Sequence, residues 1–162
     1  MVEVGERAPA FTVPMAGGGA YNDIEEFTLP EALGDGPVVL AFVPAAFTSA
    51  CTEQLCSFRD AIARFEALDA RVYGLSVDLP FSLNTWMREQ DITFPMLSDW
   101  DHEVIHLYDA VLDDMYGSIE VARRCVFVVD AGGTVTFRRD YRTADPEVDL
   151  AEIEAAVAAA AT

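Results

Sequence analysis

The sequence predicts an α/β fold in which a mixed central sheet is flanked by helices. Residues 38–43 are continuously apolar, which is typical of a strand covered on both faces. Residues 52–68 carry apolar side chains at spacings of three and four, which indicates a helix with one buried stripe. Strand and helix patterns then alternate and end in a hairpin and a last helix, so the sheet is expected to be mixed.

The segment before the apolar strand contains few structural signals. Residues 10–13 are a short initial segment, and the three glycines at 17–19 indicate a loop. Residues 26–29 predict a small edge strand. Little of the function is expected to lie in this part of the chain.

The segment after the long helix alternates between the two patterns. It predicts a strand at 71–77, a helix at 81–90, a short strand at 94–97 and a short helix at 102–108. Residues 125–129 form the next strand, which a tight turn at 130–133 joins to a partner at 134–138. Pro146 is expected to open the final helix, whose inward side chains are Val148, Leu150, Ile153 and Val157.

Length and charge indicate one acidic globular domain over residues 1–162. The chain has 28 acidic and 10 basic residues, a formal net charge of −18 and 52% hydrophobic residues, and every basic residue is arginine. An acid-coated surface of this kind is expected to need high ionic strength, which suggests a halophile, and it disfavours nucleic acid and anionic membranes as partners. The first five residues do not resemble a signal peptide, so a cytoplasmic protein is expected.

Cys51 is the residue with the clearest chemical signal. It lies where the apolar strand gives way to the long helix, and both the free N–H groups and the dipole of a helix start favour a thiolate. The spacing Cys51-x4-Cys56, with Cys125 far away, does not match a zinc-binding pair, so no metal is expected. Gly132-Gly133 is interpreted as a turn because no helix follows to bind a phosphate.

The motif Pro44-x3-Thr48-x2-Cys51 resembles the active-site signature of the peroxiredoxins, which are thiol peroxidases with a thioredoxin-like fold. The resemblance covers nearly the whole chain. It includes Ala8-Pro9-Ala10-Phe11, residues 94–99 (FPMLSD) and Arg124-x2-Phe127-x-Val129-Asp130, all in the order of the family. It implies that hydrogen peroxide and organic hydroperoxides are reduced without a cofactor.

The same resemblance implies a role for each matching residue. Cys51 attacks the peroxide, Thr48 contacts both the thiolate and the peroxide, Pro44 shields the pocket, and Arg124 stabilises the thiolate and orients the substrate. Simpler interpretations stay open: Thr48 as a helix cap, Pro44 as a turn residue, and Arg123 in place of Arg124. The family usually has an acidic residue where this chain has Gln54, so we expect a tuned site.

Cys56 matches the resolving position of the bacterioferritin-comigratory branch, whereas much of the remaining chain is closer to the one-cysteine, alkyl hydroperoxide reductase E-like branch. Residues five apart in a helix have Cα atoms about 8.7 Å apart, and a disulfide spans at most about 7 Å. A Cys51–Cys56 bond therefore requires unwinding. Cys56 as a packing residue, with an external thiol as resolving group, is the alternative. Cys125 is expected to be structural and to face the opposite side of the sheet from Arg124.

The expected partners are a peroxide, a thioredoxin-like or low-molecular-weight thiol reductant, and a second copy of the chain in a homodimer. A thioredoxin-type oxidoreductase would need a C-x-x-C pair, while a non-catalytic redox sensor or holdase on the same fold stays open. His102 and His106 form either half a metal site or a solvated helix face. Trp86 is expected in the core or at a subunit interface.

Overall fold

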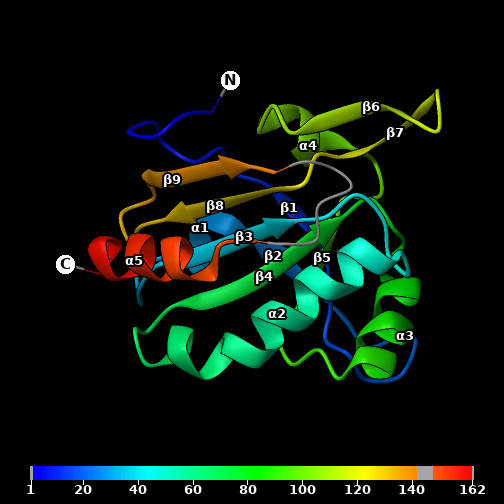
Figure 1. Ribbon diagram of the computed structural model, residues 1–162, viewed down its shortest axis with the longest axis horizontal. Coiled ribbons are helices and arrows are strands. Elements are labelled where there is room, and N and C mark those ends of the chain that lie inside the picture. Colours follow the sequence, from blue (N-terminus) through cyan, green and yellow to red (C-terminus); the bar gives the residue numbers. More distant parts are fainter. Residues whose placement is uncertain (1, 142–147, 162) are drawn as a thin grey trace.

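The computed structural model describes residues 2–141 and 148–161, and it has the expected α/β architecture (Figure 1). The strands of the main sheet are β1 (Thr12–Ala16), β2 (Ile24–Thr28), β3 (Val38–Phe42), β4 (Arg71–Ser76), β5 (Met96–Ser98), β8 (Cys125–Val129) and β9 (Val135–Asp140). Their order is β2-β1-β5-β4-β3-β8-β9. The central strands β3, β4 and β5 are parallel and the outer pairings are antiparallel, so the sheet is mixed as predicted.

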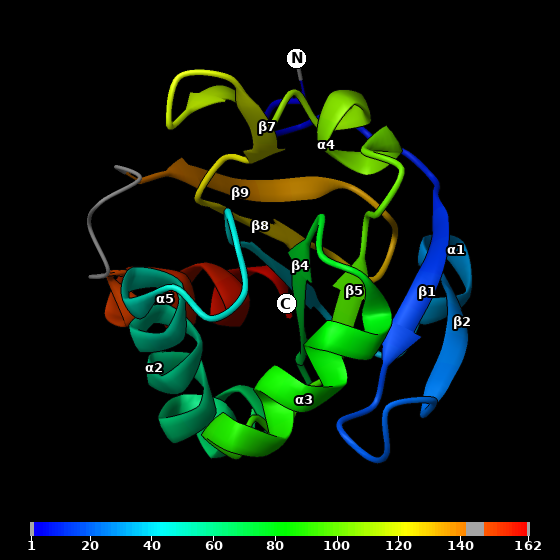
Figure 2. The same cartoon turned by 90° about the vertical axis from the view of Figure 1, so that its right-hand side faces the viewer.

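Helices cover both faces of this sheet. Helices α2 (Ser49–Glu66), α3 (Pro80–Gln90) and α5 (Leu150–Ala160) lie on one face, while α4 (Glu103–Leu107) lies on the other and the short α1 (Leu29–Ala32) beside β1 and β2 (Figure 2). Val39 of β3 packs in the core under α2, and its neighbour Leu40 packs in the core on the opposite face. Both faces of β3 are buried, which explains why its sequence is continuously apolar.

Several boundaries differ from the prediction. Helix α2 begins at Ser49 rather than at residue 52, so Cys51 lies within its first turn. The expected strands at 26–29 and 94–97 are found at Ile24–Thr28 and Met96–Ser98.

The last helix also begins later than expected. Pro146 lies outside the described residues, and helix α5 starts at Leu150, where the Asp149 carboxylate caps it by accepting the Glu152 N–H at 3.1 Å. A capping carboxylate stabilises a helix start. The inward residues are as predicted: Ile153 and Val157 are buried, and Val148 and Leu150 pack against the same core.

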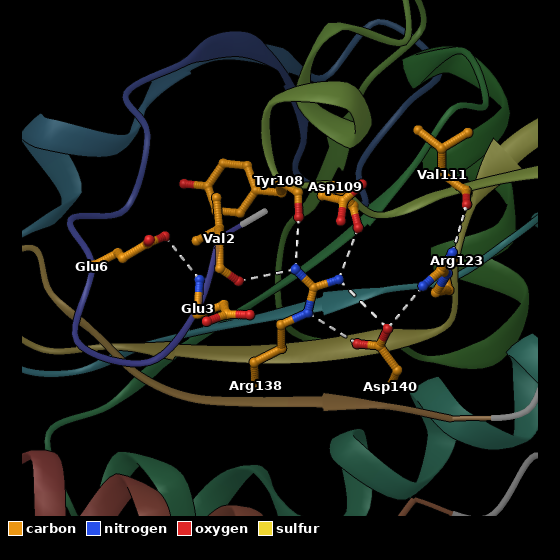
Figure 3. Close-up of polar contacts among 9 residues, drawn as sticks. All are labelled: Val2, Glu3, Glu6, Tyr108, Asp109, Val111, Arg123, Arg138 and Asp140. Atoms are coloured by element: carbon orange, nitrogen blue, oxygen red, sulfur yellow. Dashed lines mark hydrogen bonds and ion pairs between the residues drawn. The ribbon is translucent and has the colours of Figure 1, made fainter.

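A second, two-stranded sheet was not predicted from the sequence. Strands β6 (Val111–Met115) and β7 (Ile119–Ala122) form a hairpin that stands apart from the main sheet. A polar network holds its base (Figure 3). Arg123 donates to the Val111 carbonyl at 3.3 Å and pairs with Asp140 of β9 at 3.1 Å. Arg138 donates to the carbonyls of Val2, Tyr108 and Asp109. The hairpin therefore starts from a fixed position.

Candidate active site

The loop between β3 and α2 carries the predicted motif and is held from the neighbouring strand. The Ala46 N–H donates to the Asp78 carboxylate at 2.8 Å, and the Ser76 hydroxyl at the end of β4 donates to the same oxygen at 2.8 Å. Phe47 has a φ of 68°, a left-handed conformation that is uncommon for a bulky residue. These bonds outside the loop support that backbone conformation, which sets the direction in which α2 begins.

Cys51 lies in the first turn of α2 and is 1% exposed. It is close to the unpaired N–H groups and the positive end of the helix dipole, which favour an anion. The Arg124 guanidinium donates from Nη2 to the Cys51 sulfur at 3.4 Å. A buried sulfur at a helix start, in contact with a cation, is the environment in which a thiol reacts as a thiolate.

Arg124 reaches Cys51 because of the strand register. In the antiparallel pair β3–β8, Phe42 is opposite Cys125, so Arg124 lies next to the beginning of the loop that follows β3. Arg124 is 1% exposed and also donates from Nη1 to the Gln54 side-chain oxygen at 2.5 Å. Its neighbour Arg123 pairs instead with Asp140 (Figure 3). The structure brings Arg124, and not Arg123, to the cysteine.

Pro44 and Thr48 border the same space. Pro44 is buried, and Thr48 is the N-cap residue of α2 by position. The Thr48 side chain makes no capping hydrogen bond; its hydroxyl donates to the Ala45 carbonyl at 2.9 Å. A side-chain cap therefore does not explain this residue. The hydroxyl oxygen keeps its lone pairs as acceptors, and a hydroxyl that rotates away from the Ala45 carbonyl can donate to a molecule in the pocket.

These residues enclose a pocket of about 370 Å³. One side consists of Pro44, Thr48, Cys51 and Arg124, as the motif predicts, with Ser49 and Ala50 of the first helical turn. The other side was not predicted and comes from the β6–β7 hairpin: Leu112, Asp114, Met115 and Tyr116. The sequence signal for this hairpin was Gly117, because glycine most readily adopts the positive φ found there; Tyr116 before it also has a positive φ.

Gln54 is the residue at which the sequence departs from the active-site pattern that it resembles. It is fully buried, and its oxygen accepts from Arg124. Its side-chain nitrogen has no hydrogen-bond partner among the described residues. Because the amide carries no charge, the contact with Gln54 does not itself neutralise the positive charge of Arg124 beside the Cys51 sulfur.

Cys56 faces a different side of α2 from Cys51. Its thiol is half-buried and donates to the Gln90 side-chain oxygen of α3 at 3.8 Å. Five residues of helix turn the chain by about 500°, which places the two side chains about 140° apart. All three cysteines are free thiols in this structure. The indole N–H of the buried Trp86 also donates to the Thr52 hydroxyl at 3.1 Å, which joins α3 to the first turns of α2 and identifies Trp86 as a core residue.

Cys125 lies on the opposite face of the sheet, as predicted, in the core that contains Phe42 and Phe127. Burial raises the pKa of the Cys125 thiol far above its ordinary value, which keeps the thiol protonated. A buried, protonated thiol is a weak nucleophile, so its packing explains its presence.

The two histidines bind one carboxylate. His102 Nδ1 and His106 Nε2 lie 2.9 and 3.0 Å from the same Glu120 oxygen at the start of β7. Hydrogen bonds from His106 and His102 lower the pKa of Glu120. Over residues 2–141 and 148–161, no group of three or more histidine, cysteine or acidic side chains is arranged to hold a metal ion.

Comparison with known proteins gives one consistent result. The sequence profile of the AhpC/TSA family matches residues 4–138. A Mycobacterium tuberculosis protein whose name assigns it to the peroxiredoxins is 40% identical over 133 residues, which are 81% of this chain and 80% of that protein. Alkyl hydroperoxide reductase E of the same species is 33% identical over 138 residues, 85% and 84% of the two chains. The crystal structure of the M. tuberculosis peroxidoxin BcpB superimposes with a TM-score of 0.84 at 25% identity and covers 98% of each chain.

Proposed function

The chain belongs to the AhpC/TSA family and is a thiol-dependent peroxidase with a thioredoxin-like fold, and from this premise we propose that Cys51 is the residue that attacks the peroxide. The observation that carries the proposal is the position of the Cys51 sulfur. It is buried in a helix start, 3.4 Å from the Arg124 guanidinium, at the wall of a pocket of about 370 Å³.

The chemical step follows from this arrangement. The Cys51 thiolate attacks the terminal oxygen of a hydroperoxide; a sulfur–oxygen bond forms and the oxygen–oxygen bond breaks. Sulfur is oxidised to a sulfenic acid, and the departing alkoxide or hydroxide takes up a proton to leave as an alcohol or water. Charge moves from sulfur to oxygen during the step, so donors at that oxygen stabilise the transition state.

Arg124 and Thr48 are the proposed donors. The Arg124 guanidinium has several N–H groups in one plane and contacts the sulfur already, so it can stabilise both the thiolate and the peroxide oxygen. Thr48 supplies a hydroxyl at the pocket wall, and buried Pro44 limits access of water to the sulfur. Neutral Gln54 positions Arg124 without cancelling its charge.

Cys56 is proposed to resolve the sulfenic acid by forming a disulfide with Cys51 and releasing water. The spacing Cys51-x4-Cys56, which resembles that of the bacterioferritin-comigratory branch, supports this route. The resemblance of much of the remaining chain to the one-cysteine branch supports the alternative, in which an external thiol resolves the sulfenic acid. Either route ends with reduction by a thioredoxin-like protein or a low-molecular-weight thiol. No observation on the site favours a non-catalytic redox sensor or holdase.

The cellular environment and the oligomeric state are proposed from the charge and the exposed apolar residues of the protein. No helix of the described residues is long and apolar enough to span a membrane. The net charge of −18 supports a cytoplasm rich in salt, as in a halophile. Phe47, Leu79 and Phe81 lie in adjoining segments near the site and are each about half exposed, which supports a homodimer through this face.

The assignment is tested with cysteine variants. Cys51→Ser is expected to abolish peroxide consumption, because an alcohol is not ionised at neutral pH. Cys125→Ser is the matched control and should retain the rate. Cys56→Ser should keep the first step, measured by stopped-flow oxidation, but accumulate sulfenic acid. Consumption of peroxide by Cys51→Ser at the wild-type rate would refute the assignment.

The resolving step has its own test. One equivalent of peroxide should produce a Cys51–Cys56 disulfide together with loss of helix near residues 51–58, measured by mass spectrometry and circular dichroism. Finding only sulfenic acid, or a mixed disulfide with added thiol, would instead establish the one-cysteine route.

A further inference from the structure

The β6–β7 hairpin forms a wall of the pocket that the catalytic motif does not account for. Its contribution consists of two apolar side chains, Leu112 and Met115, a carboxylate, Asp114, and the exposed Tyr116 at the tip. None of these residues has a place in the chemical step. Their position opposite the reacting sulfur suits them to contact the part of a peroxide that does not react.

The backbone directs these side chains into one space. Leu112 and Asp114 are two residues apart in β6, so they point to the same face of the strand. A strict alternation would turn Met115 to the other face, but the pairing with β7 shifts register between Leu112 and Met115. A bulge of this kind re-aims a side chain, and Met115 consequently lines the same pocket.

Contacts at both ends of the β6–β7 hairpin hold it in a fixed position beside the pocket. At its base Arg123 binds the Val111 carbonyl and pairs with Asp140 (Figure 3), and the Arg123 N–H donates to the Ala110 carbonyl at 2.7 Å. Farther along, Glu120 is held by His106 of α4 and by His102, the N-cap residue of that helix. A wall held from the main sheet and from a helix keeps its shape when a substrate arrives.

The size and charge of the pocket indicate its substrate. A water molecule occupies about 30 Å³ in the liquid, so a pocket of about 370 Å³ is much larger than hydrogen peroxide requires. The extra space is bordered by Leu112 and Met115. Among the described residues the lining has one guanidinium, Arg124, which is already bonded to Cys51 and Gln54, and one carboxylate, Asp114.

We propose that the β6–β7 hairpin determines substrate choice: Leu112 and Met115 bind the alkyl or aryl group of an uncharged organic hydroperoxide, and Asp114 disfavours hydroperoxides that carry a carboxylate. This inference rests on the proposed function, because it concerns the peroxide that reacts with Cys51. Asp114 is an exposed residue at the edge of the pocket, so its repulsion is partly screened by water and salt and is expected to be modest and strongest at low ionic strength.

The charge part is tested with a matched pair of substrates, cumene hydroperoxide and its para-carboxylate derivative, which differ in one charge. The rate constants for Cys51 oxidation are measured by stopped flow. Asp114→Asn is expected to raise the rate for the carboxylate relative to the neutral peroxide about threefold to fivefold, the size of a partly screened charge interaction. Asp113→Asn, which removes an equal charge from the same strand outside the pocket lining, should leave the ratio unchanged. Equal shifts in both variants would overturn the role of Asp114.

The apolar part is tested with the ratio of rates for cumene hydroperoxide and hydrogen peroxide. Met115→Ala is expected to lower this ratio about fivefold, since contacts in an apolar pocket discriminate by roughly tenfold or more when fully enclosed. Ile119→Ala is the control, because Ile119 pairs with Met115 across the hairpin but does not line the pocket. Leu112→Ala is a second variant in case Met115→Ala disturbs the hairpin.

The hairpin proposal and the peroxidase assignment can fail separately. Ratios that stay unchanged in both Met115→Ala and Leu112→Ala would overturn the apolar wall while the peroxidase assignment stands. Wild-type rates in Cys51→Ser would overturn the proposed function itself, whatever the hairpin variants do.

Discussion

The contact between the Arg124 guanidinium and the Cys51 sulfur distinguishes this site from that of an ordinary buried cysteine. Arg124 is 1% exposed and contacts both the Cys51 sulfur and the Gln54 oxygen. Burying a guanidinium is costly, so such an arrangement is expected where the charge has a function. The neutral Gln54 fits this view, because an acidic residue there would compete with the Cys51 thiolate for the same cation.

The Arg124 arrangement predicts the effect of removing the charge. Arg124→Gln should lower the rate constant for Cys51 oxidation by roughly 10²–10³, as is typical for loss of one donor to a developing charge. Stopped-flow oxidation measures the rate, and circular dichroism checks the fold. Arg139→Gln is the control, because Arg139 pairs with Glu152 and does not line the pocket. A rate for Arg124→Gln within about threefold of wild type would contradict the proposed role of the guanidinium.

At the scale of elements, the junction between α2 and α3 governs the resolving step. Cys51 is 1% exposed and Cys56 faces another side of the helix, so a bond between the two sulfurs requires the first turns of α2 to open. The same opening exposes the Cys51 sulfur more widely to an external thiol. The hydrogen bond from Trp86 to Thr52 closes those turns against α3. A net contribution of about 0.5–1.5 kcal/mol is usual for such a bond.

Removing this bond is therefore expected to favour opening. Trp86→Phe keeps an aromatic ring but lacks the N–H donor, and it should speed disulfide formation or reaction with external thiol by about twofold to tenfold. The first oxidation step should change little. Thr52→Val removes the acceptor and should give the same result, and the double variant should add nothing further. Both rates are measured by rapid-mixing mass spectrometry, and slower resolution in Trp86→Phe would contradict the prediction.

A second junction, between α4 and β7, predicts a pH dependence. Hydrogen bonds from His106 and His102 lower the pKa of Glu120 below its ordinary value of 4.5. The folded state therefore prefers the carboxylate, and the resulting stability is fully present above pH 4.5 and lost as pH falls through the lower folded value. The melting temperature of wild type should fall more steeply below this pH than that of Glu120→Gln. Asp113→Asn, on the same hairpin, serves as the charge control, and parallel curves for wild type and Glu120→Gln would count against the prediction.

The elements differ in how far the sequence could predict them. Strands β3 and β8 and helix α2 were recognisable because burial imposes a continuous or a periodic apolar pattern on them. The β6–β7 hairpin was missed because only Val121 and Ala122 of its strand residues are buried, so no clear apolar pattern marks it, and because its bulge interrupts the alternation. The motif predicted which residues surround Cys51. It could not predict the Thr48 bond to the Ala45 carbonyl, or the unpartnered Gln54 nitrogen among the described residues, because both depend on how side chains are arranged in the folded chain.

For the whole molecule, the dominant feature is charge. The chain has 28 acidic and 10 basic residues, so its net charge is −18 and its acidic groups outnumber its basic groups nearly threefold. Among the described residues, several ion pairs lie at the surface, such as Arg71 with Asp35, whereas Arg138, which pairs with Asp140, is largely buried. Exposed ion pairs contribute little to the free energy of unfolding, so screening them with salt lowers stability only slightly. The same salt screens the repulsion among the many carboxylates, which is expected to raise stability by more.

The melting temperature is therefore expected to rise with salt. The Debye length shortens from about 10 Å at 0.1 M to about 3 Å at 1 M, and each kcal/mol of relieved repulsion should raise the melting temperature by about 2–4 °C for a chain of this size. Potassium chloride and potassium sulfate should raise the melting temperature at equal ionic strength, because screening depends on ionic strength. An effect of sulfate alone would indicate strengthened apolar burial, because sulfate is excluded from the protein surface. Calorimetry at both salt concentrations measures the effect. An unchanged melting temperature in chloride would contradict the proposal of a salt-rich cytoplasm and leave the chemistry of Cys51 untouched.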